Sequence, residues 1–71
     1  MNQRLKTCIE ILKHCIKYKI SGAEGCAKFN KPNDFINSCV NETRELISGN
    51  NPTPEQKAFF EVYNQFIDIL L

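Results

Sequence analysis

LKTCIEILKHCIKYKI, residues 5–20, is the stretch whose periodicity decides the fold class. Its apolar residues recur at steps of one and three positions, which places them on one face of an α-helix: Leu5, Cys8, Ile9, Leu12, Cys15 and Ile16, with Ile11 widening this face. The opposite face carries Lys6, Glu10, Lys13 and Lys17. Gly22 follows the last periodic residue, Ile20, and suits the left-handed position that ends many helices. We therefore expect an amphipathic helix from about residue 2 to residue 20.

The residues after this helix show a weaker pattern. Ser21 and Glu24 have the S-x-x-E spacing of a capping box, which allows a short helix at about 22–29. Gly22 and Gly25 lower the helix propensity of the same segment. The short helix is therefore an optional element of the predicted fold.

Two longer patterns fill the second half of the chain. After Pro32, which disfavours helical backbone at the residue before it, helical spacing predicts a helix at about 33–48 with the apolar positions Phe35, Ile36, Cys39, Val40, Thr43, Leu46 and Ile47. Thr53-Pro54-Glu55-Gln56 then combines an N-cap residue, a proline suited to the first helical position and a capping-box glutamine. It predicts a helix at about 54–71 whose apolar face holds Ala58, Phe59, Val62, Tyr63, Phe66, Ile69 and Leu70.

The composition agrees with a small folded domain. The chain has 71 residues, of which 42% are hydrophobic and 24% charged, as in ordinary globular proteins. Its length allows one domain, residues 1–71. The sequence therefore predicts an all-α fold, a compact bundle of three main helices at about 2–20, 33–48 and 54–71, with the short helix at about 22–29 as an optional fourth.

Charge is distributed unevenly along the chain. The total is +1, but residues 1–31 carry a net charge of +5 and residues 32–71 a net charge of −4. Either the two halves attract each other on folding, which is the simpler interpretation, or the basic half binds a polyanion.

The sequence also indicates a compartment. Charged residues interrupt the N-terminal segment every few positions, unlike a signal peptide, and no apolar run reaches the 18 or so residues that a membrane span needs. We therefore expect a cytoplasmic protein that does not enter a membrane, with its four cysteines reduced. Eight asparagines, eight isoleucines and no tryptophan suggest an AT-rich coding source such as a bacterium with low GC content, a phage or a virus.

The cysteines are the first candidates for chemistry. Their separations of 7, 11 and 13 residues include no C-x-x-C pair of the kind that zinc sites use, so no metal and no cofactor are expected. Cys8 and Cys15 lie two turns apart on one helix, about 10.5 Å along its axis, which is too far for a disulfide between them. Each could still meet Cys26 or Cys39 on a neighbouring element. The favoured interpretation is that of reduced core thiols, and a disulfide or a metal site stays open as an alternative.

No catalytic constellation is evident. His14 neighbours Cys15, but adjacent helical side chains diverge by about 100° and do not face each other. The carboxylate pairs Glu42 with Glu45 and Glu61 with Asp68 have no histidine in their segments. The sequence therefore predicts a protein that is not an enzyme.

Two surfaces are candidates for binding. The predicted helix at about 54–71 is apolar around a wide arc, so residues beside its core face either pack within the chain or contact a partner: Phe60, Tyr63, Ile67 and Leu71. Lys6, Lys13 and Lys17 form a basic stripe that is either a solvated face or a polyanion-binding site. The leading hypothesis is a small regulator, inhibitor or adaptor that binds a protein partner or a second copy through a helical face. The alternative is a regulator that binds nucleic acid through the lysine stripe.

Overall fold

Four α-helices form the part of the chain that the structure describes. The computed structural model describes residues 3–70, and for Leu70 the backbone alone. The helices are α1 (Gln3–Tyr18), α2 (Gly22–Lys28), α3 (Phe35–Ile47) and α4 (Pro54–Leu70), and no strand occurs among these residues. The prediction of an all-α fold is therefore confirmed, and the optional short helix is present. Residues 2 and 71, at the outer ends of two predicted helices, lie outside the described residues.

The end of α1 differs from the prediction. The helix ends at Tyr18, and Lys19 takes the left-handed conformation, with φ 55°. The Ile20 N–H then donates to the Cys15 carbonyl oxygen at 3.1 Å, which is the hydrogen bond of a Schellman motif. The prediction that Gly22 fills this position was wrong, because the chain turns three residues earlier and Gly22 becomes the first residue of α2.

The caps at the starts of α2 and α4 follow the sequence signals. At α2, the Glu24 N–H donates to Ser21 Oγ at 3.2 Å. At α4, the Gln56 N–H donates to Thr53 Oγ1 at 3.2 Å and the Thr53 N–H donates to Gln56 Oε1 at 2.8 Å, so the predicted capping box is confirmed on both sides.

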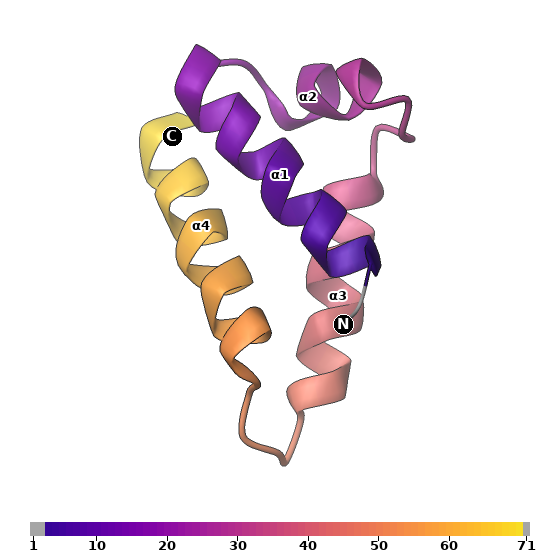
Figure 1. Cartoon of the computed structure of the whole chain (residues 1–71), viewed down its shortest axis with the longest axis vertical. Coiled ribbons are helices and arrows are strands. Elements are labelled where there is room, and N and C mark those ends of the chain that lie inside the picture. Colours follow the sequence, from indigo (N-terminus) through magenta and orange to yellow (C-terminus); the bar gives the residue numbers. More distant parts are fainter. Residues whose placement is uncertain (1–2, 71) are drawn as a thin grey trace.

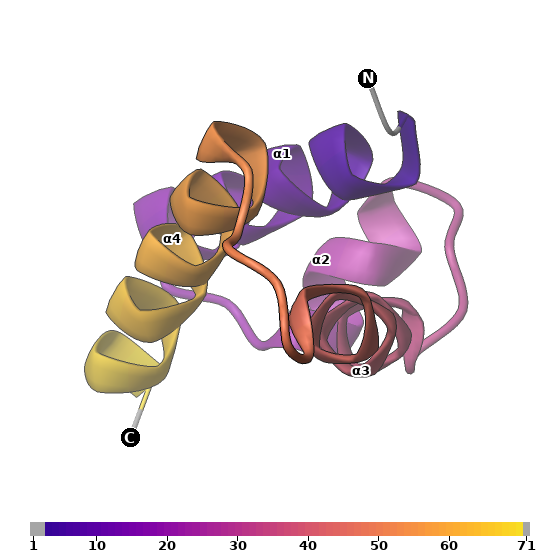
Figure 2. The same cartoon turned by 90° about the horizontal axis from the view of Figure 1, so that it is seen from below.

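The helix α1 is the centre of the packing. It contacts each of the other three helices, while α3 and α4 diverge from the loop that joins them and form a V that α1 crosses (Figures 1 and 2). The core consists of ten buried residues, five of them from α1: Leu5, Cys8, Ile11, Leu12, Cys15, Cys26, Ile36, Cys39, Val40 and Phe59. Ile9 and Ile16 are only half-buried, whereas Ile11 is fully buried, because Gly25 of α2 packs closely against the Ile11 side chain.

Candidate functional site

The helix α4 leaves much of its apolar surface in solvent. Of its described side chains, Phe59 alone is fully buried. Seven other apolar residues of the helix stay partly or largely exposed: Ala58, Phe60, Val62, Tyr63, Phe66, Ile67 and Ile69. Ala58 and Ile69 were predicted to lie on the core face, and Ile69 is instead 48% exposed. The reason is the packing, since α4 contacts mainly α1 and the diverging α3 does not cover it.

Four aromatic rings on α4 form a continuous row. The Phe59 ring centroid lies 5.2 Å from that of Phe60 and 6.1 Å from that of Tyr63, and Tyr63 lies 6.4 Å from Phe66. These separations fall in the range where aromatic side chains attract one another. Phe59 is fully buried in the core and fixes one end of these ring contacts. The row therefore forms one continuous apolar surface rather than a set of separate side chains.

The predicted partner-binding residues on this helix differ in what they contact. Phe60 and Tyr63 are half-buried and pack against the core cluster. Ile67 is half-buried and lies one turn beyond Tyr63 on the helix. Leu71 lies outside the described residues. The structure thus places Phe60 and Tyr63 against the same ring, that of Phe59, and puts Ile67 farther along the helix.

A shallow groove beside this helix could not be read from the sequence. Its volume is about 290 Å³, and its walls come from α4, from α2 and from the start of α3: Gly22, Ala23, Asn33, Ile36, Asn37, Tyr63 and Phe66. Two further hollows, of about 250 and 330 Å³, lie at the α3–α4 loop and beside His14. All three are near or below the lower end of the size range of small-molecule pockets. The tertiary arrangement assembles each from separate segments.

The predicted basic stripe lies on the outside of α1. Lys6, Lys13 and Lys17 are all exposed. The Lys17 ammonium lies 5.4 Å from the ring centroid of Tyr18, which is itself 56% exposed. The basic and acidic halves of the chain also meet, because Arg4 of α1 pairs with Glu42 of α3 at 2.9 Å. This ion pair is an example of the attraction between halves that the charge distribution suggested.

The four cysteines lie in the core. Each is at most 2% exposed and all four are free thiols. Burial raises the pKa of the Cys8 and Cys15 thiols above the ordinary value, because the thiolate would lose its hydration. Among residues 3–70, no group of three or more histidine, cysteine or carboxylate side chains is placed to hold a metal ion.

The histidine and carboxylate candidates are not brought together. His14 is half-buried, with its ring centroid 4.6 Å from that of Tyr18 and 5.6 Å from that of Phe29. The neighbouring Cys15 thiol instead donates to the Ser21 carbonyl oxygen at 3.5 Å. Glu42 pairs with Arg4, while Glu45, Glu61 and Asp68 lie exposed on the surface.

Two findings concern the chain as a whole rather than one of its sites. Within residues 3–70, no helix has both the length and the apolar character required to traverse a lipid bilayer. Comparison of the chain with protein-family models, with curated proteins and with solved structures found no match.

Proposed function

We propose that this protein is a small non-enzymatic interaction protein, a regulator, inhibitor or adaptor, that binds a protein partner or a second copy of itself through α4. The observation that carries the proposal is that α4 is rich in apolar residues but buries few of them. It presents seven apolar side chains that are not fully buried and one that is. Apolar surface gathered on one element favours association, because its removal from water is favourable.

The row of aromatic rings supports the same proposal. Aromatic residues are enriched at protein interfaces because they bury a large area with few rotatable bonds. On α4 their rotamers are restricted further by contact with Phe59, which reduces the entropy lost on binding. We place the protein in the cytoplasm, whose reducing conditions keep its four buried thiols free unless a disulfide oxidant accumulates.

The variant Ile67→Asp tests this proposal. Ile67 is half-exposed, so a charge at this position disrupts an interface more than it disrupts the core. The matched control is Gln65→Glu, which adds the same charge at an exposed position on the same helix. Native mass spectrometry and sedimentation of the two variants and the parent chain measure self-association. If the parent chain is monomeric, a photo-crosslinker at position 67 is used to capture the partner from cells.

We expect Ile67→Asp to lose assembly or crosslinking by at least tenfold, while Gln65→Glu retains it. Circular dichroism must show that both variants remain helical. Equal assembly by all three chains, or a monomeric parent without a specific crosslink, would argue against α4 as the interface.

A second candidate function is nucleic-acid binding through α1. Three lysines share the exposed face of the helix, and the exposed Tyr18 ring beside Lys17 could stack on a base. Fluorescence anisotropy with labelled single-stranded and duplex DNA tests this candidate. It requires binding that weakens steeply with salt and that is lost in the Lys13→Glu, Lys17→Glu double variant. Binding that is unchanged in that variant would exclude the lysine stripe as the site.

A further inference from the structure

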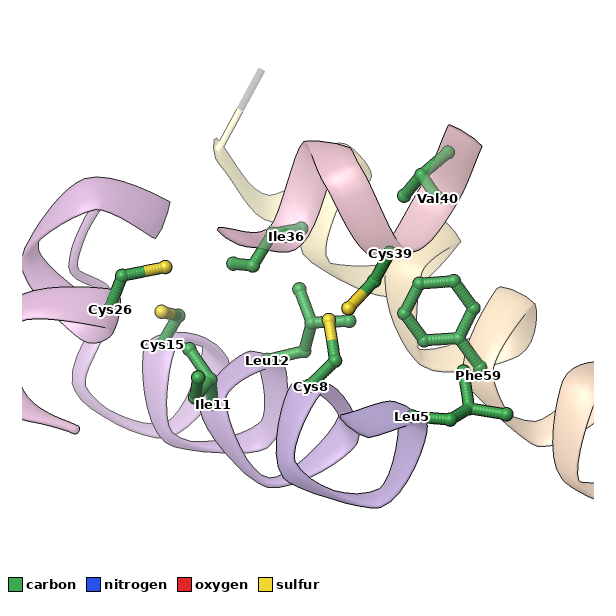
Figure 3. Packing of buried hydrophobic residues seen from close by; sticks show 10 residues of the cluster. All are labelled: Leu5, Cys8, Ile11, Leu12, Cys15, Cys26, Ile36, Cys39, Val40 and Phe59. Carbon is green, nitrogen blue, oxygen red and sulfur yellow. The ribbon is translucent and has the colours of Figure 1, made fainter. Parts of the chain in front are cut away.

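The four buried thiols form two facing pairs. Cys8 of α1 faces Cys39 of α3 (Figure 3). Cys15 of α1 faces Cys26 of α2, and Figure 3 shows the sulfur atoms of each pair pointing toward each other. A core that needed only small apolar residues would not have to place its four thiols two by two. This arrangement places a possible disulfide partner beside each of the two thiols of α1 (Figure 3).

The geometry allows one pairing pattern. Cys8 and Cys15 are separated by about 10.5 Å along α1, and a disulfide tolerates at most about 7 Å between Cα atoms. Cys39 lies beside the Cys8 end of this interval and Cys26 beside the Cys15 end (Figure 3). Exchanging the partners would require each bond to span the interval, so Cys8–Cys26 and Cys15–Cys39 bonds do not fit the fold.

The approach of α2 to α1 depends on Gly25. A Cβ atom at this position would overlap Cys15 Sγ and would lie 3.3 Å from Ile11 Cγ2. The missing side chain lets the α2 backbone come close enough for the adjacent Cys26 to face Cys15. Gly25 lowers the helix propensity of α2, but it makes the second thiol pair sterically feasible.

We propose that Cys8 with Cys39 and Cys15 with Cys26 are two sites of disulfide formation, closed by a low-molecular-weight disulfide such as glutathione disulfide. For each bond, one protein thiolate attacks a sulfur of the oxidant, releases one glutathione thiol and forms a mixed disulfide. The second protein thiolate then attacks the mixed disulfide and releases the second glutathione thiol. The protein loses two hydrogen atoms per bond, and the oxidant gains both.

Oxidation takes place while the chain folds or when it opens locally. In the folded chain all four thiols are withdrawn from solvent, and the thiols of Cys8 and Cys15 are held in the protonated, unreactive form. The finished bonds would tie α1 to α3 and α1 to α2. Because α4 contains no cysteine, its packing against α1 would still depend on non-covalent contacts alone.

Tryptic peptide mapping tests the proposal directly. The chain is reduced, unfolded and refolded in a glutathione redox buffer, and remaining thiols are blocked at acid pH. Trypsin places every cysteine on a different peptide, since Pro32 protects the bond after Lys31: residues 7–13, 14–17, 20–28 and 29–44. The expected product is a monomer four hydrogen atoms lighter than the reduced chain, with 7–13 linked to 29–44 and 14–17 linked to 20–28. A different pairing, bonds between chains, or four blocked thiols would overturn the proposal.

Two further measurements distinguish native bonds from accidental ones. The oxidised chain should unfold at a temperature about 10 °C or more above the reduced chain, because the bonds restrict the unfolded state. An equal or lower unfolding temperature would show that the bonds do not fit the fold. In the Cys26→Ser variant, the bond between Cys8 and Cys39 should persist while Cys15 is blocked. Bonding of Cys15 to another cysteine in this variant would also overturn the proposal, and if the variant does not fold, the map of the parent chain decides.

Discussion

The helices α1 and α4 are almost equal in length and both rich in apolar residues, yet they bury them very differently. In α1 five side chains are buried, two of them cysteines, and the helix contacts α2, α3 and α4. In α4 one described side chain, that of Phe59, is fully buried, and the helix contacts mainly α1. The comparison teaches that the number of neighbours, rather than the apolar content of a helix, determines how much of it is withdrawn from water.

The largest expected effect comes from truncating the core face of α1. Leu12 is fully buried, so Leu12→Ala should lower the free energy of unfolding by about 2–5 kcal/mol. For a domain of this size that loss is comparable with its whole stability. Urea unfolding followed by circular dichroism measures it. The matched change on α4, Ile67→Ala, should cost less than about 1 kcal/mol because Ile67 stays partly in solvent. Equal losses would remove the distinction between the two helices.

A smaller loss of stability is expected when a methyl group is added where α2 packs closely on α1. Gly25→Ala should destabilise the fold by about 1–3 kcal/mol, because its Cβ would overlap Cys15 Sγ. Gly22→Ala is the control, since a Cβ there meets Ile36 and Phe66 at 3.4 Å, close to ordinary contact. In thermal melts, adding Cys15→Ala to Gly25→Ala should recover part of the lost stability. If Gly25→Ala instead raises the melting temperature, α2 does not pack as closely as the structure indicates.

Removing a hydroxyl should have opposite consequences on the two helices. Thr53 caps α4 through its side chain, and Thr53→Ala should cost about 1 kcal/mol. Thr7 lies inside α1 and its hydroxyl donates to the Gln3 carbonyl oxygen at 3.0 Å. Thr7→Ala should be neutral or slightly stabilising, because alanine has the higher helix propensity. Chemical denaturation of both variants checks this contrast, and a loss at Thr7 as large as that at Thr53 would contradict it.

The smallest effect is expected at the ion pair between α1 and α3. Arg4 and Glu42 are each 43% exposed, so Glu42→Gln should cost about 0.2–1 kcal/mol at low salt. The loss should disappear in concentrated sodium chloride, where exposed charges are screened. Glu45→Gln, at an exposed position on the same helix, serves as the control. A loss that persists at high salt would mean that Glu42 contributes by packing rather than by charge.

Helix positions and caps were largely predictable because their causes are local. The apolar spacing of residues 5–16, the Ser21 cap and the Thr53–Gln56 capping box act within one or two turns of the chain. The end of α1 was mispredicted because Lys19, rather than a glycine, adopts the left-handed conformation. Residues other than glycine, asparagine and aspartate take it infrequently, so sequence propensities do not indicate it.

The candidate sites were predictable only in part. The sequence marked the wide apolar arc of α4 but placed Ile69 on the wrong side of the boundary between core and surface. The groove shared by Tyr63, Ile36 and Gly22 joins residues from three helices, and nothing local connects them. Likewise, spacing excluded a Cys8–Cys15 bond, but it left open which partner each thiol faces.

The sequence by itself determined that the chain is helical, where α2 and α4 begin, and that two of its cysteines cannot pair with each other. These properties follow from hydrogen bonds and periodicity within a few residues. The tertiary structure decided that α1 lies at the centre, that α4 keeps an apolar face in solvent, and that Cys8 meets Cys39 while Cys15 meets Cys26. The physical reason is that an amphipathic pattern indicates which apolar surface a helix has available to bury. Only the arrangement of the neighbouring helices determines which part of that apolar surface is covered.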